Sequence, residues 1–248
     1  MRILHEGVSI TGRRSNNEDA VLELPERGLF AVADGMGGYE GGEVASKAAL
    51  ASLQAYCDML DHTGLGLSQM GTPEGERIAR ERLELGIRIA DREVRRRAVG
   101  DLRKMGTTLA ALAVGPTKAM VAHVGDSRVY RMREGEVIAL TRDHSLINEM
   151  KTAGLGATEA DHFRLKNIIT QALGQGRTVM PDLTAVEVLP GDRFLLCSDG
   201  LSDVLDDEAI AWAMTSKHDV ARALVDAAYA AGSYDNITAL VVTAAEGD

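Results

Sequence analysis

The feature that most constrains the fold is a series of short apolar segments separated by turn residues. Residues 118–141, KAMVAHVGDSRVYRMREGEVIALT, contain three such segments with only brief turns between them. Strands joined this closely pair antiparallel, because a parallel crossover needs a dozen or more residues. Segments of the same kind are GLFAVADG, TTLAALAVG, NIITQAL, LTAVEVLP, DRFLLCSDG and NITALVVTAA. The sequence therefore predicts antiparallel sheets.

Helical patterns occur in pairs and do not alternate with the strands. The first pair spans residues 42–99, with one helix ending near Leu60 and the next running from Glu74 to about Val99; the second pair spans residues 207–231. This order argues against a doubly wound parallel sheet. We expect an α+β fold in which antiparallel sheets pack together and helices cover their outer faces.

Length and composition bound the class of protein. The chain has 248 residues, 45% of them hydrophobic, and no low-complexity linker, so we expect a single domain over residues 1–248. Its net charge of −10 argues against nucleic acid as the main partner. No segment reaches the ~20 apolar residues of a membrane span. Cys57 and Cys197 give no disulfide framework, and Cys197, in an apolar run, is predicted to be a buried thiol, which suits a reducing compartment. We therefore expect a soluble, cytoplasmic protein without a membrane partner. Because no exposed apolar helix stands out in the sequence, we expect a monomer.

Carboxylates stand where predicted strands begin or end. They are Glu18, Asp19, Asp34, Asp126, Asp199 and Asp235. Each alone is explained as an ordinary turn residue. Neighbouring strand ends of one sheet, however, lie about 5 Å apart. Several carboxylates gathered there repel one another unless a cation neutralises them. The pattern therefore favours a cation site at one end of a sheet.

The ligand types indicate which metal such a site would hold. Carboxylates and carbonyls without sets of Cys or His suit Mg²⁺ or Mn²⁺. A shared aspartate could bridge two ions, and a two-metal site suits in-line displacement at phosphorus. Arg13 and Arg14 precede the acids and could orient a phosphate. The glycines around Asp34 would let a main-chain carbonyl approach a metal, whereas the phosphate loop GxxxxGK[ST] of nucleotide-binding proteins is missing.

Two other chemistries fit less well. A cysteine-dependent phosphatase needs an arginine after its nucleophile, but Thr63 and Asp203 stand six positions after the two cysteines. The histidines lack metal-ligand spacing. His123 alternates with apolar residues and is predicted to be a packed core residue. His144 either lies near the site or serves a turn or helix cap.

Motifs along the chain resemble those of one family. RRSNNED, VADGMGG, MGTTLAAL, AHVGDSRVY, TRDHSL, NIITQALG, LLCSDGL and YDNITALVV follow in order from residue 13 to residue 242. The chain is similar to bacterial type-2C protein phosphatases, the metal-dependent PPM family. The resemblance implies a four-layer α-β-β-α sandwich of two antiparallel sheets, a metal centre at one end of them, and a flap subdomain over about residues 145–166.

The resemblance also implies roles for single residues at two core ions of Mn²⁺ or Mg²⁺. Asp34 would bridge both ions, and Asp199 and Asp235 would complete one of them. The carbonyl of Gly35 and the acidic pair Glu18/Asp19 would serve the other ion. Which member of that pair ligates directly stays open.

Further positions carry over in the same way. Arg14 matches the phosphate-binding arginine, and Asp126 matches the aspartate of a third, weaker metal site. Met36 and Tyr39 occupy positions where relatives carry a histidine proposed to donate a proton to the leaving group. That proton would then come from a metal-bound water or another residue.

The function implied is that of a metal-dependent protein serine/threonine phosphatase. A metal-bridging hydroxide would attack phosphoserine or phosphothreonine directly, and a cognate Ser/Thr kinase would be its counterpart. The alternative is a pseudophosphatase that binds phosphoproteins without turnover, a class marked by loss of a metal aspartate; Asp34, Asp199 and Asp235 are all present and favour the enzyme. A two-metal nuclease is disfavoured by the acidic balance.

Overall fold

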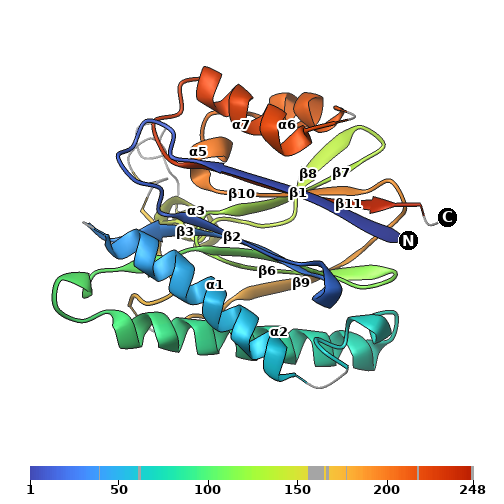
Figure 1. The fold of residues 1–248 in the computed structure, drawn as a ribbon, viewed down its shortest axis with the longest axis horizontal. Helices are drawn as coiled ribbons and strands as arrows, with labels where there is room; N and C mark the ends of the chain where they lie inside the picture. The colour runs from blue at the N-terminus through green and yellow to red at the C-terminus, as the bar shows by residue number, and fades with distance from the viewer. Residues whose placement is uncertain are drawn as a thin grey trace.

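The structure is a computed structural model of the 248-residue chain. The residues it describes are 1–38, 40–60, 63–155, 165, 168–176, 178–216 and 218–246. Two antiparallel sheets lie face to face, and helices cover the outer face of each, which gives four layers in the order α-β-β-α (Figure 1). The predicted α+β sandwich is confirmed.

The first sheet has five strands, which in spatial order are β1 (Arg2–Ile10), β11 (Ile237–Ala245), β10 (Arg193–Cys197), β7 (Arg128–Arg133) and β8 (Glu136–Ala139). The second sheet contains, in spatial order, β2 (Asp19–Leu24), β3 (Leu29–Met36), β5 (Leu109–Val114), β6 (Lys118–Val124) and β9 (Asp182–Glu187), with β4 (Gly106–Thr107) paired to the end of β3. In the described part of the chain, every pairing between neighbouring strands is antiparallel, and the first and last strands, β1 and β11, lie side by side.

Apolar side chains on both faces of the central strands hold the layers together. Along β3, Leu29, Ala31 and Ala33 belong to the core beneath the helices, whereas Phe30 and Val32 belong to the core between the sheets. A strand buried on both faces has no polar side to alternate with. This is why β3 reads in the sequence as a continuous apolar run.

The helices pack as the sequence predicts. α1 (Gly41–Met59) and α2 (Pro73–Arg97) cover the second sheet, and α6 (Asp207–Met214) and α7 (Val220–Ala230) cover the first (Figure 1). Shorter helices are α3 (Leu146–Thr152), α5 (Asp199–Ser202), η1 (Pro25–Arg27), η2 (Leu67–Gln69) and η3 (Gly100–Leu102). No helix in the described part of the chain has both the length and the apolar character needed to cross a bilayer.

Two segments differ from the prediction. The NIITQAL segment is not a strand: among its described residues, Ile169 and Leu173 form only isolated bridges, to Ser145 and Thr107. Because the two bridges have different partners, no ladder can extend through the segment. β1 was not predicted as a strand, since charged residues and a glycine interrupt its apolar pattern at an exposed sheet edge. Part of the predicted flap, residues 156–164 and 166, lies outside the described residues; the part that is described contains α3.

Candidate metal centre

Strand register brings two carboxylates together in the second sheet. In the antiparallel β2–β3 pair, Asp19 stands directly opposite Asp34. Directly opposed residues have Cβ atoms about 4.5–5.5 Å apart, and like charges at such positions are destabilising. Asp126 belongs to the same sheet, because it follows β6 after Gly125. The sequence spacing alone does not reveal the pairing of Asp19 with Asp34.

The remaining acids come from the first sheet. Asp199 begins α5 directly after β10, and Asp235 stands two residues before β11. Since Cys197 of β10 pairs with Ala239 of β11, these two turns are adjacent. The argument from neighbouring strand ends of one sheet therefore covers only some of the acids: the carboxylates face each other from both sheets at one end of the sandwich, the position that the family resemblance implies for a metal centre.

These acids surround a cleft of about 660 Å³. Its lining comprises Arg14, Ser15, Asn16, Glu18, Asp34, Gly35, Met36, Gly37, Gly38, Thr108, Asp126, Ile169, Asp199 and Asp235. The cleft lies at the end of the sandwich where α1 begins, on the left in Figure 1. Every predicted site residue except Arg13 and Asp19 lines it; the Arg13 guanidinium instead lies over the ring of Tyr229, 5.4 Å from its centroid. Tyr39 is outside the described residues.

Asp19 lies beneath the cleft and joins the two sheets. Its Oδ2 accepts hydrogen bonds from Ser198 Oγ (2.8 Å) and Thr238 Oγ1 (2.6 Å), both from the first sheet. Its Oδ1 is buried and has no hydrogen-bond partner among the residues that the structure describes. A buried, unpaired carboxylate oxygen is costly, so this atom marks a position where a cation or an ordered water would be stabilised. The neighbouring Glu18, by contrast, lines the cleft itself.

A single asparagine fixes the loop that carries Arg14. Asn236 Oδ1 accepts a hydrogen bond from Glu18 N (2.8 Å), and its Nδ2 donates to Thr11 O (2.9 Å) and Asn16 O (2.8 Å). Arg14, 51% exposed, points its Nη2 at Asp235 Oδ2 (2.6 Å). Sequence reasoning missed Asn236, although its place beside Asp235 in YDNIT is a usable signal.

Burial and mutual repulsion raise the pKa of the clustered carboxyls. Burial is the largest cause, and it raises the pKa of Asp19 to about 7, of Asp199 to about 6 and of Asp126 to about 8, with neighbouring acids adding to each shift. The pKa of Asp34 rises well above its usual range through burial and then through Asp19. Without a cation the cluster holds protons, whereas a divalent ion would favour the ionised ligands. The all-oxygen donor set fits Mg²⁺ or Mn²⁺.

The glycines around Asp34 are required by close packing. A Cβ on Gly35 would lie 2.0 Å from Gly42 O, and a Cβ on Gly42 would lie 2.6 Å from Glu18 Cδ. A Cβ on Gly35 would also lie 2.7 Å from Glu18 O, so the end of β3 packs against the main chain of both α1 and the Glu18 loop, and Gly42 packs against the Glu18 side chain. This contact adds a second reason for the glycines to the predicted approach of a carbonyl to a metal.

A second cluster of possible metal ligands contains His123, His144 and Asp182. The two imidazole rings are tilted against each other with their centroids 4.3 Å apart, and both are hydrogen-bonded to Gly125: its N–H donates to His144 Nδ1 (3.2 Å), and its carbonyl accepts from His123 Nε2 (3.2 Å). His144 Nε2 then carries the proton that faces Asp182 Oδ2 (3.3 Å). The cluster therefore clamps the turn before Asp126, and the predicted core position of His123 is confirmed. Burial lowers the pKa of His123 to about 4.

The fold and the carboxylate cleft together define a class of protein. Residues 6–231 match the family described as protein phosphatase 2C, and the chain belongs to this family.

Named relatives extend over nearly the whole chain. The protein phosphatase PhpP of Streptococcus pneumoniae is 36% identical over 245 residues, which cover 95% of each chain. The serine/threonine protein phosphatase PstP of Mycobacterium tuberculosis is 35% identical over 240 residues; these cover 95% of this chain but only 43% of PstP, so the chain spans less than half the length of that relative. A solved structure of the PstP catalytic domain in complex with two manganese ions is 33% identical, with a TM-score of 0.82 and coverage of 98% of this chain and 99% of that one.

Proposed function

We propose that this chain is a metal-dependent phosphatase that removes phosphate from phosphoserine and phosphothreonine in proteins. The observation that carries the proposal is the convergence of carboxylates from both sheets around Asp34, in a cleft that also contains Arg14. The names of the relatives support it.

The carboxylates would provide the ligands for two core ions of Mn²⁺ or Mg²⁺. Asp34, at the centre of the cluster, would touch both ions, Asp199 and Asp235 would complete one, and the Gly35 carbonyl would serve the other. Glu18 is the better candidate for direct contact, because it lines the cleft and Asp19 lies below it. Bound ions would lower the pKa of a water to supply the nucleophile and would offset charge on the phosphoryl oxygens.

Arg14 would orient the phosphate. Its Nη2 is held by Asp235, and its other guanidinium N–H groups remain available to form paired hydrogen bonds with phosphate oxygens. Asp126 would hold a third, weaker ion: it is 8% exposed at the cleft, and burial first, then its neighbours Asp199 and Asp143, raise its pKa.

The biological setting is part of the proposal. We infer one catalytic domain over residues 1–248 with a flap near residues 145–166, acting as a monomer on phosphoproteins opposite a Ser/Thr kinase. A cytoplasmic location fits the two buried free thiols, Cys57 and Cys197.

The test is hydrolysis of p-nitrophenyl phosphate and of a phosphothreonine peptide, with Mn²⁺, with Mg²⁺ and with chelator. Activity should require the metal, and Asp34→Asn should reduce kcat by roughly a hundredfold or more, since it removes the proposed bridging ligand. Asp58→Asn, at an exposed position on α1, is the matched control. Activity in the presence of chelator, or full activity of Asp34→Asn, would rule out the two-metal site. Peptide binding by a wild type that lacks turnover would support the pseudophosphatase.

A further inference from the structure

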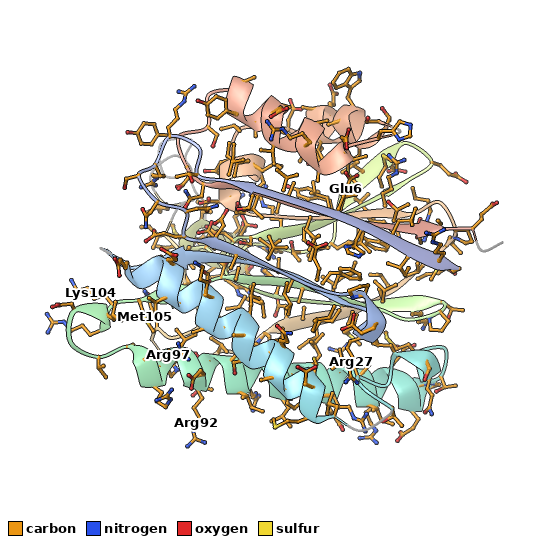
Figure 2. The ribbon with its side chains drawn as sticks, viewed as in Figure 1. Glu6, Arg27, Arg92, Arg97, Lys104 and Met105 are labelled. Atoms are coloured by element: carbon orange, nitrogen blue, oxygen red, sulfur yellow. The ribbon has the colours of Figure 1, made fainter. Side chains whose placement is uncertain are left out.

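A second cavity opens beside the metal cleft. It has a volume of about 610 Å³. Its lining comprises Gly37, Gly38, Gly100, Asp101, Arg103 and Lys104. Gly37 and Gly38 also line the cleft around Asp34, so the two cavities meet at this turn. Figure 2 shows Lys104 at the end of the molecule where α1 begins. A side chain adjacent to a group seated in the cleft would therefore face the second cavity.

The second cavity carries an excess of positive charge. Arg103 and Lys104 are exposed, and within the described part of the chain neither side chain has an ion pair or hydrogen bond. Asp101 is the single acidic residue of the lining. The contrast with α2 is informative, because Arg77 and Arg88 there are paired with glutamates one turn away. On a chain of net charge −10, unpaired cations beside the cleft make a local site for anions.

The main chain that carries these cations is held in place. Gly37 has a φ of +130°, and a Cβ there would lie 2.6 Å from the Cα of Met105, which is fully buried. Gln175 Nε2 donates a hydrogen bond to Lys104 O (2.6 Å), and Met105 N donates to Leu102 O (2.9 Å). Because the loop is already ordered, binding would cost mainly the freedom of the two long side chains.

We propose that Arg103 and Lys104 form an anion subsite that recognises an acidic group close to the phosphorylated residue of a substrate; this rests on the proposed phosphatase function. Both side chains donate charge-assisted hydrogen bonds to a carboxylate or a phosphate. An extended peptide advances about 3.3 Å per residue, so the anion would lie within a few residues of the residue whose phosphate sits at Arg14. The substrates favoured are acidic or multiply phosphorylated segments.

The test compares kcat/KM on four substrates: p-nitrophenyl phosphate and three phosphothreonine peptides whose flanking residues are neutral, contain glutamate, or contain a second phosphothreonine. The wild type should prefer the peptides with added anions by roughly fivefold, a preference that salt weakens. Arg103→Gln/Lys104→Gln should abolish this preference while leaving p-nitrophenyl phosphate and the neutral peptide unchanged. The last two peptides distinguish carboxylate from phosphate as the group recognised.

A charge-matched control separates the subsite from the overall charge of the protein. Arg27→Gln/Arg92→Gln removes two cations that Figure 2 shows away from Lys104, one near the opposite end and one on the outer side of α2. This variant should keep the preference. Equal loss in both double variants, or a preference that survives Arg103→Gln/Lys104→Gln, would overturn the subsite. A wild type active on p-nitrophenyl phosphate but indifferent to flanking anions would overturn the subsite alone. A wild type inactive on every substrate would overturn the phosphatase proposal and the subsite with it.

Discussion

The metal-free protein should lose stability as the pH rises, in contrast to the usual acid denaturation of proteins. Burial, with help from neighbouring acids, raises the pKa of Asp19 to about 7, of Asp199 to about 6 and of Asp126 to about 8. In the unfolded chain these carboxyls titrate near their ordinary pKa of about 4. Between about pH 5 and pH 8 the folded protein therefore holds protons that the unfolded chain has released. Their contribution to stability is complete below the unfolded pKa and is lost as the pH rises through the folded pKa values.

The size of the effect follows from the number of protons held. One proton bound only by the folded state gives a slope of about 1.4 kcal/mol per pH unit. The acids interact, so protons leave the cluster as a group, and two effective protons give about 3 kcal/mol per pH unit at the steepest point. For a chain of 248 residues, each kcal/mol lowers Tm by roughly 2–4 °C, so Tm should fall by roughly 6–12 °C per pH unit there.

Thermal unfolding followed by circular dichroism, with chelator and then with Mn²⁺, measures this slope. Mn²⁺ should raise Tm and flatten the pH dependence, because the ions replace the protons; at a hundred times Kd the gain is about 2.7 kcal/mol. Asp34→Asn removes a central charge and should reduce the metal-free slope, whereas the exposed Asp58→Asn should leave it unchanged. A metal-free Tm that stays level or rises between about pH 5 and pH 8 would refute the reasoning.

Two further predictions concern the residues that position the site. Asn236→Asp places a carboxylate oxygen against two main-chain carbonyl oxygens and should destabilise the folded protein by about 2–4 kcal/mol. The variant should have a lower Tm and, because the loop that carries Arg14 loses its support, a lower kcat/KM for p-nitrophenyl phosphate. Wild-type values of both quantities would contradict this role of Asn236. His144→Leu leaves the Gly125 N–H without its acceptor and should cost about 1–3 kcal/mol in urea unfolding. Asp182→Asn removes the exposed carboxylate that faces His144 Nε2 and should lower the free energy of unfolding by less than about 1 kcal/mol. If Asp182→Asn destabilised the protein more than His144→Leu, the hydrogen bond from Gly125 N–H to His144 would be unimportant.

The sequence was sufficient to predict the layers because the relevant signals are local. Turn residues between apolar runs predict antiparallel strands. The helix predicted from Glu74 begins one residue earlier, at Pro73, where Thr72 Oγ1 accepts a hydrogen bond from Gly75 N (3.0 Å). A buried thiol at Cys197 was likewise predicted and is confirmed. Each of these features depends on contacts within a few residues or on average burial.

The details of the site depend on contacts between distant segments. Asp19 is hydrogen-bonded to Ser198 and Thr238, which are 179 and 219 residues away in the sequence. The sequence near these three residues does not predict that they lie together. The distribution of the acids over both sheets could not be worked out from the strand ends for the same reason: an Asp-Gly pair after a strand shows where the strand ends, not which sheet contains it. From the sequence, Gly42 is an ordinary residue at the start of a helix. Only the structure shows that a Cβ at this position would lie 2.7 Å from the main-chain carbon of Gly35, so that a side chain would not fit.

The same contacts show why site and fold depend on each other. Asp19 ties β2 of the second sheet to residues beside β10 and β11 of the first, and Asn236, just before β11, holds the loop of Arg14. The carboxylates therefore meet only when both sheets are packed, and that packing forces like charges together in a region with little water. Protons can relieve the repulsion at low pH, but near neutral pH a divalent ion does so more fully, because it favours the ionised form of every ligand. On this account the cation required by the proposed chemistry also stabilises the contact between the two sheets.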